Sequence, residues 1–293
     1  MTVWWRLLVA AALGACGRID FDAASRATGD AATGDAAPAC TFGPWSTPQP
    51  ISELETAMND WGGQITGDGL TLYWSIERTL YVASRPDRQS PFGAASLVAG
   101  ITGDSGNPSP TGDELELFYD SDQMTATYDV VRTTRSDTAS AWSNNTPLAA
   151  LVVGGVDVSG PYITPDDGLT LYYTRGIPTG TLMVSTRAST SDPFTAGTPV
   201  AGITGNHSNA ALSADQLTIY FETGIQPARL LFTGSRPTIA DPFGTATALT
   251  VNDTAADNSD VSITADGLEL FFSSNRAGGA GNADLYVATR ACQ

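Results

Sequence analysis

Residues 263–290, ITADGLELFFSSNRAGGAGNADLYVATR, show the repeating unit of this chain most clearly. Apolar residues alternate with other residues in two runs, GLELFF and ADLYVATR, which is the pattern of β-strands. An Asp-Gly pair precedes the first run and is typical of a tight hairpin turn. The stretch therefore predicts two strands, the first of them entered through a turn.

The same unit occurs five times along the chain. Its first run appears as TGDGLTLYW (66–74), TGDELELFY (111–119), PDDGLTLYY (165–173), SADQLTIYF (213–221) and TADGLELFF (264–272), and the first leucines of these runs are 45, 54, 48 and 51 residues apart. The second run always ends in arginine, at Arg85, Arg135, Arg187, Arg236 and Arg290. A third element opens with an aromatic residue at Phe92, Trp142, Phe194 and Phe243. A period near 50 with about four strands per unit is typical of β-propeller blades. We expect an all-β, five-bladed β-propeller.

The fifth unit lacks its aromatic-led strand, and residues 40–55 carry the missing pattern. We expect this segment to be the outer strand of blade 5, which closes the ring and removes unpaired edges. The blades are then predicted at 56–102, 103–152, 153–204, 205–252 and 253–293. This register brings Cys40 and Cys292 within reach of a disulfide bond, which export from the cytoplasm makes chemically reasonable.

The N-terminus has the features of a targeting segment. Residues 1–15 contain Arg6 and a short apolar stretch, and end in Leu13-Gly14-Ala15 before Cys16. These four positions resemble a bacterial lipobox, which implies acylation of Cys16 and a lipid anchor. Residues 16–39, rich in Ala, Asp, Gly and Thr, are predicted to be a flexible tether. We expect an exported protein on the outer membrane or on the periplasmic face of a bacterial membrane.

The stretch 263–290 is also similar to the WD-repeat-like blade of TolB-type periplasmic propellers. The resemblance covers about 41–293 and implies a platform for a protein partner. The other four units depart from it after the first run. Their residues there are Ser75-Ile76-Glu77, Asp120-Ser121-Asp122, Thr174-Arg175-Gly176 and Glu222-Thr223-Gly224.

The charge of the chain limits its partners. The 293 residues carry 31 acidic side chains against 14 basic ones, all of them arginine, for a net charge of −17. Nucleic acid needs positive charge to neutralise its phosphates, so we expect no nucleic-acid binding. Electrostatic docking to an anionic lipid surface is disfavoured in the same way. Cations, neutral glycans and envelope proteins remain as partners for a monomeric propeller.

One column of residues comes just before the inner strand of each blade. We expect it to gather at one mouth of the central channel as an oxygen-rich rim, which would suit Ca²⁺, the hydroxyls of a sugar or a peptide backbone. Turns that cap the incoming loops are the alternative reading. The column comprises Asn59, Asp104, Asp157, Asn206 and Asp257, with His207 and Asp260 close by.

Residues that recur in every blade are predicted to be architectural. They are the turn aspartates Asp68, Asp113, Asp167, Asp215 and Asp266 and the five strand-end arginines. The aspartates are expected to accept local backbone N–H groups. The arginines are expected to pair with them or with an adjacent blade.

Catalytic signals are few. A single His and the absence of Lys argue against a typical zinc site, Schiff-base chemistry and a Ser-Lys pair. Some five-bladed propellers are glycosidases, which need a pair of carboxyl groups; Asp60, Asp104, Asp157 and Asp257 are the candidates by position. The sequence thus predicts a non-catalytic binding or protein-interaction platform at the cell envelope that requires no cofactor. The alternatives are a propeller that binds a glycan or Ca²⁺, and a glycoside hydrolase that uses rim aspartates.

Overall fold

A computed structural model of the protein describes residues 40–124, 127–177 and 180–293. The predicted signal segment, Cys16 and the tether lie outside the described residues. From Cys40 to Gln293 the chain forms one compact unit. None of the described residues belongs to a helix that is long and apolar enough to cross a membrane.

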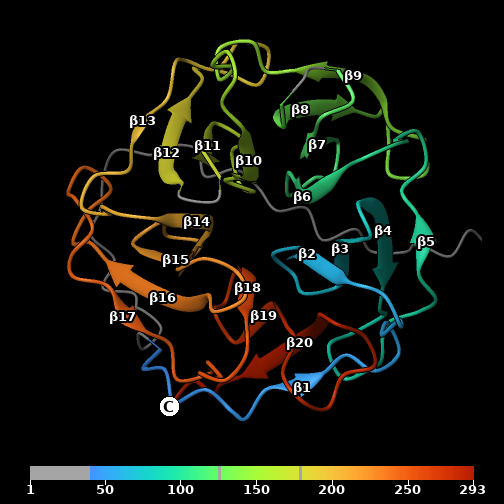
Figure 1. The fold of residues 1–293 in the computed structure, drawn as a ribbon, viewed down its shortest axis with the longest axis vertical. Coiled ribbons are helices and arrows are strands. Elements are labelled where there is room, and N and C mark those ends of the chain that lie inside the picture. The colour runs from blue at the N-terminus through green and yellow to red at the C-terminus, as the bar shows by residue number, and fades with distance from the viewer. Residues whose placement is uncertain (1–39, 125–126, 178–179) are drawn as a thin grey trace, which may run out of the picture. The chain divides into compact units, whose positions relative to one another are not determined.

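Five four-stranded sheets surround a central axis, as predicted (Figure 1). Blade 1 contains β2 (Asp60–Ile65), β3 (Thr71–Ile76), β4 (Thr79–Ser84) and β5 (Ser96–Leu97). Blade 2 contains β6 (Gly106–Pro110), β7 (Glu116–Ser121), β8 (Asp129–Thr134) and β9 (Ser143–Pro147). Blade 3 contains β10 (Val158–Ile163), β11 (Thr170–Arg175), β12 (Thr181–Thr186) and β13 (Thr198–Pro199). Blade 4 contains β14 (His207–Leu212), β15 (Thr218–Thr223), β16 (Leu230–Ser235) and β17 (Thr247–Ala248). Blade 5 contains β18 (Asn258–Ile263), β19 (Glu269–Ser274), β20 (Asp284–Thr289) and, from the other end of the chain, β1 (Gln49–Pro50).

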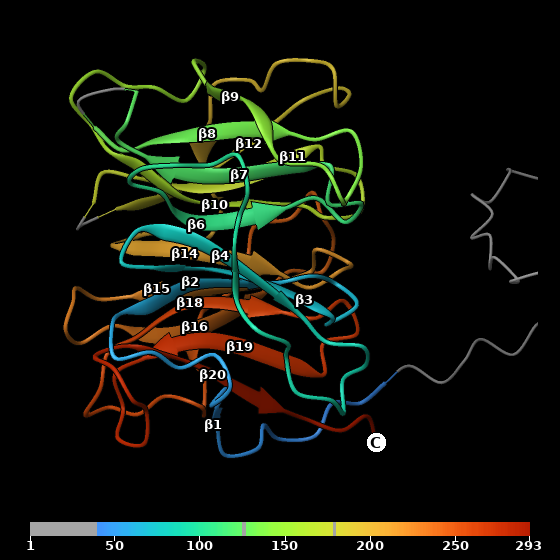
Figure 2. The same ribbon diagram turned by 90° about the vertical axis from the view of Figure 1, so that its right-hand side faces the viewer.

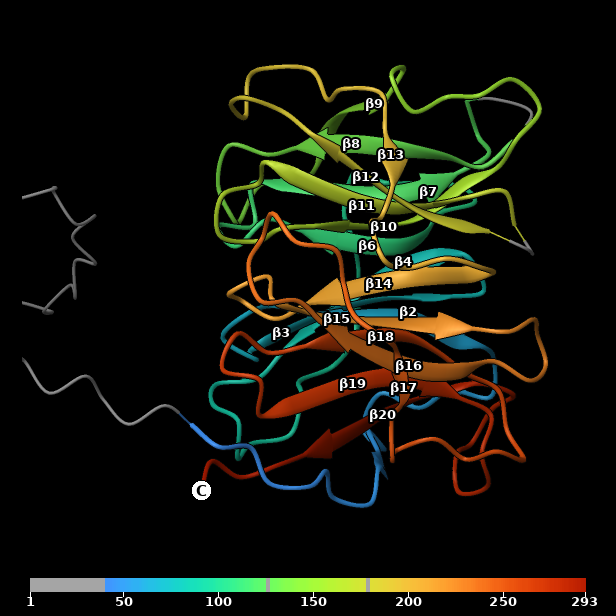
Figure 3. The same cartoon turned by 90° about the vertical axis from the view of Figure 1, so that its left-hand side faces the viewer.

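The ring closes through the two ends of the described chain. Strand β1 pairs antiparallel with β20, Gln49 lying opposite Val287. Cys40 and Cys292 form a disulfide with their Cα atoms 5.2 Å apart. In side view, the blue start of the propeller lies beside the C-terminus (Figures 2 and 3). Both the strand exchange and the disulfide predicted from the register are confirmed.

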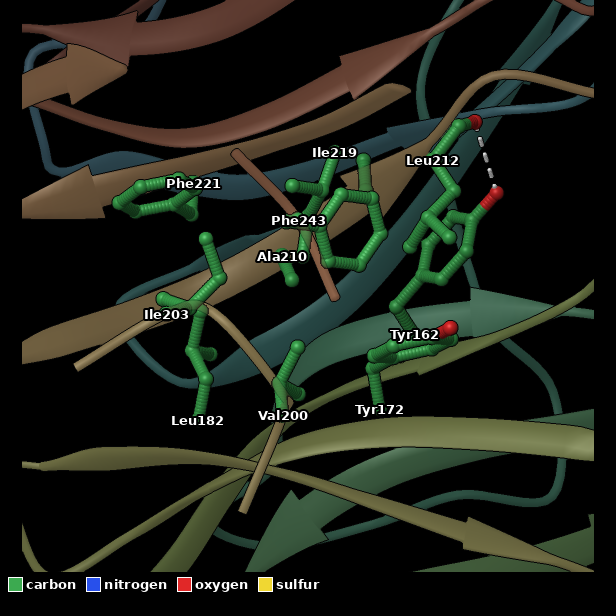
Figure 4. Packing of buried hydrophobic residues seen from close by; sticks show 11 residues of the cluster. Tyr162, Tyr172, Leu182, Val200, Ile203, Ala210, Leu212, Ile219, Phe221 and Phe243 are labelled. Atoms are coloured by element: carbon green, nitrogen blue, oxygen red, sulfur yellow. Dashed lines mark hydrogen bonds between the residues drawn. The ribbon is translucent and has the colours of Figure 1, made fainter. Parts of the chain in front are cut away.

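The core lies between blades, because the second strand of each sheet is buried on both faces. In β11, Tyr173 packs toward Phe118 of blade 2, whereas the preceding Tyr172 packs toward Phe221 of blade 4. Figure 4 shows this second cluster, in which the hydroxyl of Tyr162 donates to the carbonyl of Leu212 at 3.1 Å. Alternation along the strand thus serves two interfaces rather than one core face and one solvent face.

The turn aspartates have the predicted local role. Asp68 accepts the backbone N–H of Leu70 at 2.9 Å and the hydroxyl of Thr66. The same pair of bonds recurs at Asp113, Asp167, Asp215 and Asp266. We call the side of the ring that carries these five turns the turn face. The opposite side, where the first strands β2, β6, β10, β14 and β18 begin, is the mouth face.

The strand-end arginines join neighbouring blades. Nε of Arg187 donates to the carbonyl of Gly168 at 2.7 Å, and the guanidinium carbon lies 4.8 Å from the ring centre of Phe194. Its remaining nitrogens reach Glu116 of the preceding blade. The other four arginines make the same backbone bond and stack on Phe92, Trp142, Phe243 and Phe42. On the preceding blade they meet Glu269, Tyr73, Tyr172 and Tyr220.

Candidate functional site at the mouth of the channel

A ring of bulged residues surrounds the axis. Each inner strand carries a register shift against its neighbour, and the first residue of each bulge has a positive φ. These residues are Gly62, Asn107, Gly160, Asn209 and Asp260. They line an axial cavity of about 20 Å³, which is room for a single water molecule. The channel is therefore constricted at this level.

The order of residue types around the ring follows from packing. A Cβ atom on Gly160 would lie 1.9 Å from Oδ1 of Asn209, so any larger residue there would displace the Asn209 side chain. A Cβ on Gly62 would lie 3.0 Å from Oδ1 of Asn107. Asn209 in turn donates from Nδ2 to Oδ1 of Asp260 at 2.6 Å. The amide and carboxyl side chains thus occupy the space that the glycines leave free.

Above the constriction, on the mouth face, a cavity of about 300 Å³ opens toward solvent, and we call it the funnel. This volume is at the lower end of the range for small-molecule sites. All five blades contribute to its wall, which combines aromatic, aliphatic and charged side chains. Its lining includes Trp61, Arg78, Asp120, Tyr128, Ile177, Glu222, Ile225, Arg229 and Asp260.

One wall of the funnel lies at the junction of blades 1 and 2. Arg78 bonds to Asp120 at 2.7 Å and also pairs with Asp104, and it lies 4.4 Å over the ring of Tyr128. Asp120, which is 1% exposed at its side chain, also accepts the backbone N–H of Gly160 at 2.9 Å. Burial lowers the pKa of Arg78, but Asp120 and Asp104 outweigh burial and the pKa is raised. The carboxylate of Asp120 is thus already occupied by donors from within the propeller.

The opposite wall lies at the junction of blades 4 and 5. Arg229 pairs with Glu222 at 3.3 Å and with Asp257 at 2.6 Å. Glu222 also accepts the hydroxyl of Ser208 at 2.6 Å and the backbone N–H of Asp260 at 3.1 Å. Burial acts to lower the pKa of Arg229, and the carboxylates around it raise it. Both walls therefore use one arginine held by two acids.

Asp260 differs from the other acids of the funnel. Its side chain accepts from Asn209 and, at 2.8 Å, from the hydroxyl of Ser259, but no arginine among the described residues forms an ion pair with it. Burial, followed by the nearby charge of Glu222, raises its pKa to about 6, against the smaller opposing effect of Arg229. Asp260 is therefore a buried carboxyl group that changes charge near neutral pH.

Of the predicted rim residues, Asp260 lines the funnel and the axial cavity, whereas the column before the inner strands lies one step outside the axis. None of Asn59, Asp104, Asp157, Asn206 and Asp257 lines the funnel or the axial cavity. The aspartates bind the preceding blade instead. Asp157 accepts the backbone N–H of Tyr128 at 3.0 Å, and Asp257 accepts that of Arg229 at 2.8 Å. The bulge column, to which Asp260 belongs, takes the axial position that we expected for the rim column.

The remaining candidates also lie away from the funnel. Asp60 is fully buried and accepts the backbone N–H of Thr56 at 3.0 Å, and burial raises its pKa. The ring of His207 lies 4.8 Å from that of Phe221, with Nε2 3.0 Å from the carbonyl of Thr204. The structure therefore does not bring the four candidate catalytic aspartates together in the funnel.

Sequence reasoning missed two acids of the funnel, Asp120 and Glu222. They occupy the fifth position of the second strand, where the other blades have Ser75, Thr174 and Ser273. In blade 3 the Thr174 hydroxyl contacts the N–H of Asn209 at 3.3 Å, the same type of contact to the next blade that Asp120 and Glu222 make. The sequence does mark these two acids, because the same strand position carries a hydroxyl group in the other three blades.

No three His, Cys, Asp or Glu side chains of the described residues come together in a way that could hold a metal ion. Calcium, which the sequence allows as one alternative ligand of the rim, stays a prediction.

The fold is shared with proteins of different activities. An α-L-arabinofuranosidase from Podospora anserina, solved with cellotriose, superposes with a TM-score of 0.58 at 11% identity, over 85% of this chain and 96% of the other. The catalytic domain of the Coprinopsis cinerea GH62 α-L-arabinofuranosidase gives 0.57 at 13% identity, over 85% and 98%. TolB from Acinetobacter baumannii gives 0.52 at 13% identity, over 82% of this chain and 56% of that protein.

At these identities the similarity establishes the fold alone. No family model matches the sequence, and no curated protein matches it either. The chain is thus a five-bladed β-propeller, a fold that it shares with TolB and with the two α-L-arabinofuranosidases.

Proposed function

We propose that this protein is a cell-envelope binding protein that captures a protein partner at the mouth of its channel without catalysing a reaction. The supporting observation is the distribution of exposed apolar side chains. Most of the exposed large apolar residues of the described chain lie in mouth-face loops, and two of them, Ile177 and Ile225, line the funnel. The exposed apolar residues of these loops are Met58, Met124, Val152, Val153, Ile177 and Ile225. Apolar groups concentrated on one face of a soluble domain are typical of an interaction surface.

The point where the chain enters the propeller favours the same surface. Cys40 is bonded to Cys292, and Phe42 packs against Arg290 beside the Gly267 turn, so the entry point lies on the turn face. The chain that precedes Cys40 therefore joins the propeller on the face opposite to the funnel.

A paired substitution tests this proposal. Changing both Ile177 and Ile225 to Asp places two charges at the mouth face, and we expect capture of envelope proteins by the immobilised full chain to be lost. Ile239→Asp is the matched control, because Ile239 is 59% exposed but lies on the turn face after β16. Equal capture by both variants, with unchanged melting temperatures, would refute a docking site at the mouth.

A glycoside hydrolase is the second candidate, favoured by Asp260 and Glu222, two neighbouring acids in a funnel, one with a raised pKa. The fold shared with two α-L-arabinofuranosidases suggests the substrate to test. Because Asp120, Glu222 and Asp257 are each occupied by arginine and backbone donors, we expect no turnover of an aryl α-L-arabinofuranoside. Turnover that Glu222→Gln abolishes would replace the binding proposal.

A further inference from the structure

The funnel carries more negative than positive charge. Its lining contains three acids, Asp120, Glu222 and Asp260, and two arginines, Arg78 and Arg229. Outside the lining, Asp104 forms an ion pair with Arg78 and Asp257 forms one with Arg229. With every group ionised, five carboxylates meet two guanidinium groups, which leaves a net charge of −3. Buried charge without a counter-charge is costly, so such a site favours a cation over a neutral or anionic group.

The excess charge is located at the junction of blades 4 and 5. Glu222 and Asp257 share Arg229, whereas Asp260 is 7% exposed and has only neutral donors. These donors are the side chains of Asn209 and Ser259 and the backbone N–H of Gly62. A carboxylate has about four acceptor positions, so Asp260 retains capacity for another donor. It lines both the axial cavity and the funnel, and is therefore reached from the mouth.

The other walls of the funnel suit an organic cation better than a bare metal ion. Trp61, Tyr128 and Ile225 form the aromatic and aliphatic part of the lining. Such surfaces pack against the methylene stem of a long basic side chain, and aromatic faces attract its charge. Calcium instead takes six to eight oxygen ligands, and no three acidic side chains of the described chain converge to supply them.

We infer that the funnel takes the guanidinium or ammonium group of a basic side chain presented by the partner polypeptide, and that this group pairs with Asp260. The inference rests on the proposed function, since it names the chemistry that the partner presents to the mouth. It also explains why the chain retains a buried acid without an ion-pair partner at the base of an open funnel.

A matched pair of peptides tests the inference with the full chain. Acetyl-Leu-Arg-Leu-amide and its citrulline counterpart have nearly the same shape and differ in charge. We expect the arginine peptide to bind about tenfold more tightly in calorimetry, since a hydrogen bond to a charged group contributes enough to reach that ratio. Asp260→Asn is expected to remove the difference. Asp166→Asn, an exposed acid of the turn face, makes the same charge change and is expected to preserve it.

Asp260→Asn suits this test because asparagine already stands at the equivalent positions, Asn107 and Asn209, with the same positive φ. Equal binding of both peptides by the wild type, no binding of either, or an unchanged preference in Asp260→Asn would overturn the inference. Agmatine that binds as tightly as the peptide would show a site for free organic cations instead of a polypeptide. If envelope capture still depends on Ile177 and Ile225 in any of these cases, the proposed function stands without the inference.

Discussion

Replacing Asp260 by Asn is predicted to change the stability of the protein in opposite directions at low and at high pH. The folded-state pKa of Asp260 is raised by burial and by Glu222 from 3.8 to about 6. A carboxyl group with a higher pKa in the folded state binds its proton more tightly there than in the unfolded chain. Its contribution to stability is present below the unfolded pKa and is lost as the pH rises through the folded pKa.

The magnitude follows from the size of this shift. A shift of about two units corresponds to roughly 3 kcal/mol between the protonated and ionised forms. Asn removes this electrostatic cost. It also loses the hydrogen bond that Asp260 accepts from Ser259, and this loss costs about 1 kcal/mol. We therefore expect the variant to be more stable than the wild type by about 2 kcal/mol near pH 8, and less stable by about 1 kcal/mol near pH 4.

Urea unfolding of both proteins between about pH 4 and pH 8, extrapolated linearly to water, measures this difference. Subtracting the two stability curves cancels the titration of every group that does not interact with Asp260. A difference that does not vary with pH would refute the reasoning, and so would a variant destabilised more at pH 8 than at pH 4. The second result would mean that attraction to Arg229 exceeds the burial cost of the Asp260 charge.

Three further predictions concern the architecture. Arg187→Ala should lower the free energy of unfolding by about 3 kcal/mol in urea, because it breaks a buried ion pair with Glu116 and leaves that carboxylate only the partly exposed Arg132. Arg236→Ala, whose arginine meets Tyr172 rather than a carboxylate, should cost clearly less, and equal losses would contradict an ion-pair role. Replacing Cys40 and Cys292 together by Ser should lower the free energy of unfolding by up to about 5 kcal/mol, since the bond closes nearly the whole propeller, and an unchanged melting temperature would show that strand pairing alone holds the ring. Gly160→Ala should lower the free energy of unfolding by several kcal/mol, because the new Cβ would meet Oδ1 of Asn209 and the residue has a positive φ. A calorimetric melting temperature within about a degree of the wild type would contradict the packing of the axial ring.

Much of the architecture could be predicted because it repeats. A turn aspartate such as Asp167 bonds to residues two or three positions away. Its role is therefore local and can be predicted from the sequence. The strand-end arginine was recognised for the same reason, although its aromatic platform was not. Stacking of Arg187 on Phe194 depends on how the third strand returns across the blade.

The site was predicted only in part, because it consists of exceptions to the repeat. The rim column was taken as axial, but an inner-strand bulge three residues further on turns Asp260 and its equivalents toward the axis. A bulge adds an extra residue to one strand, and the apolar and polar residues before and after it still alternate. The sequence pattern therefore does not reveal where the bulge lies. Asp120 and Glu222 escaped notice because their partners, Gly160 and Asp260, lie in the next blade.

By itself the sequence determined the number of blades, the closure by residues from the opposite end of the chain and the Cys40–Cys292 bond, because each depends on a period and a register that survive in one dimension. The distances between blades, which only the folded ring fixes, determine which acids of the funnel are paired with arginine and which one of them, Asp260, is not. Burial and ion pairing depend on the distances between blades, and residues about 40 positions apart, such as Arg78 and Asp120, become neighbours only when the ring has closed.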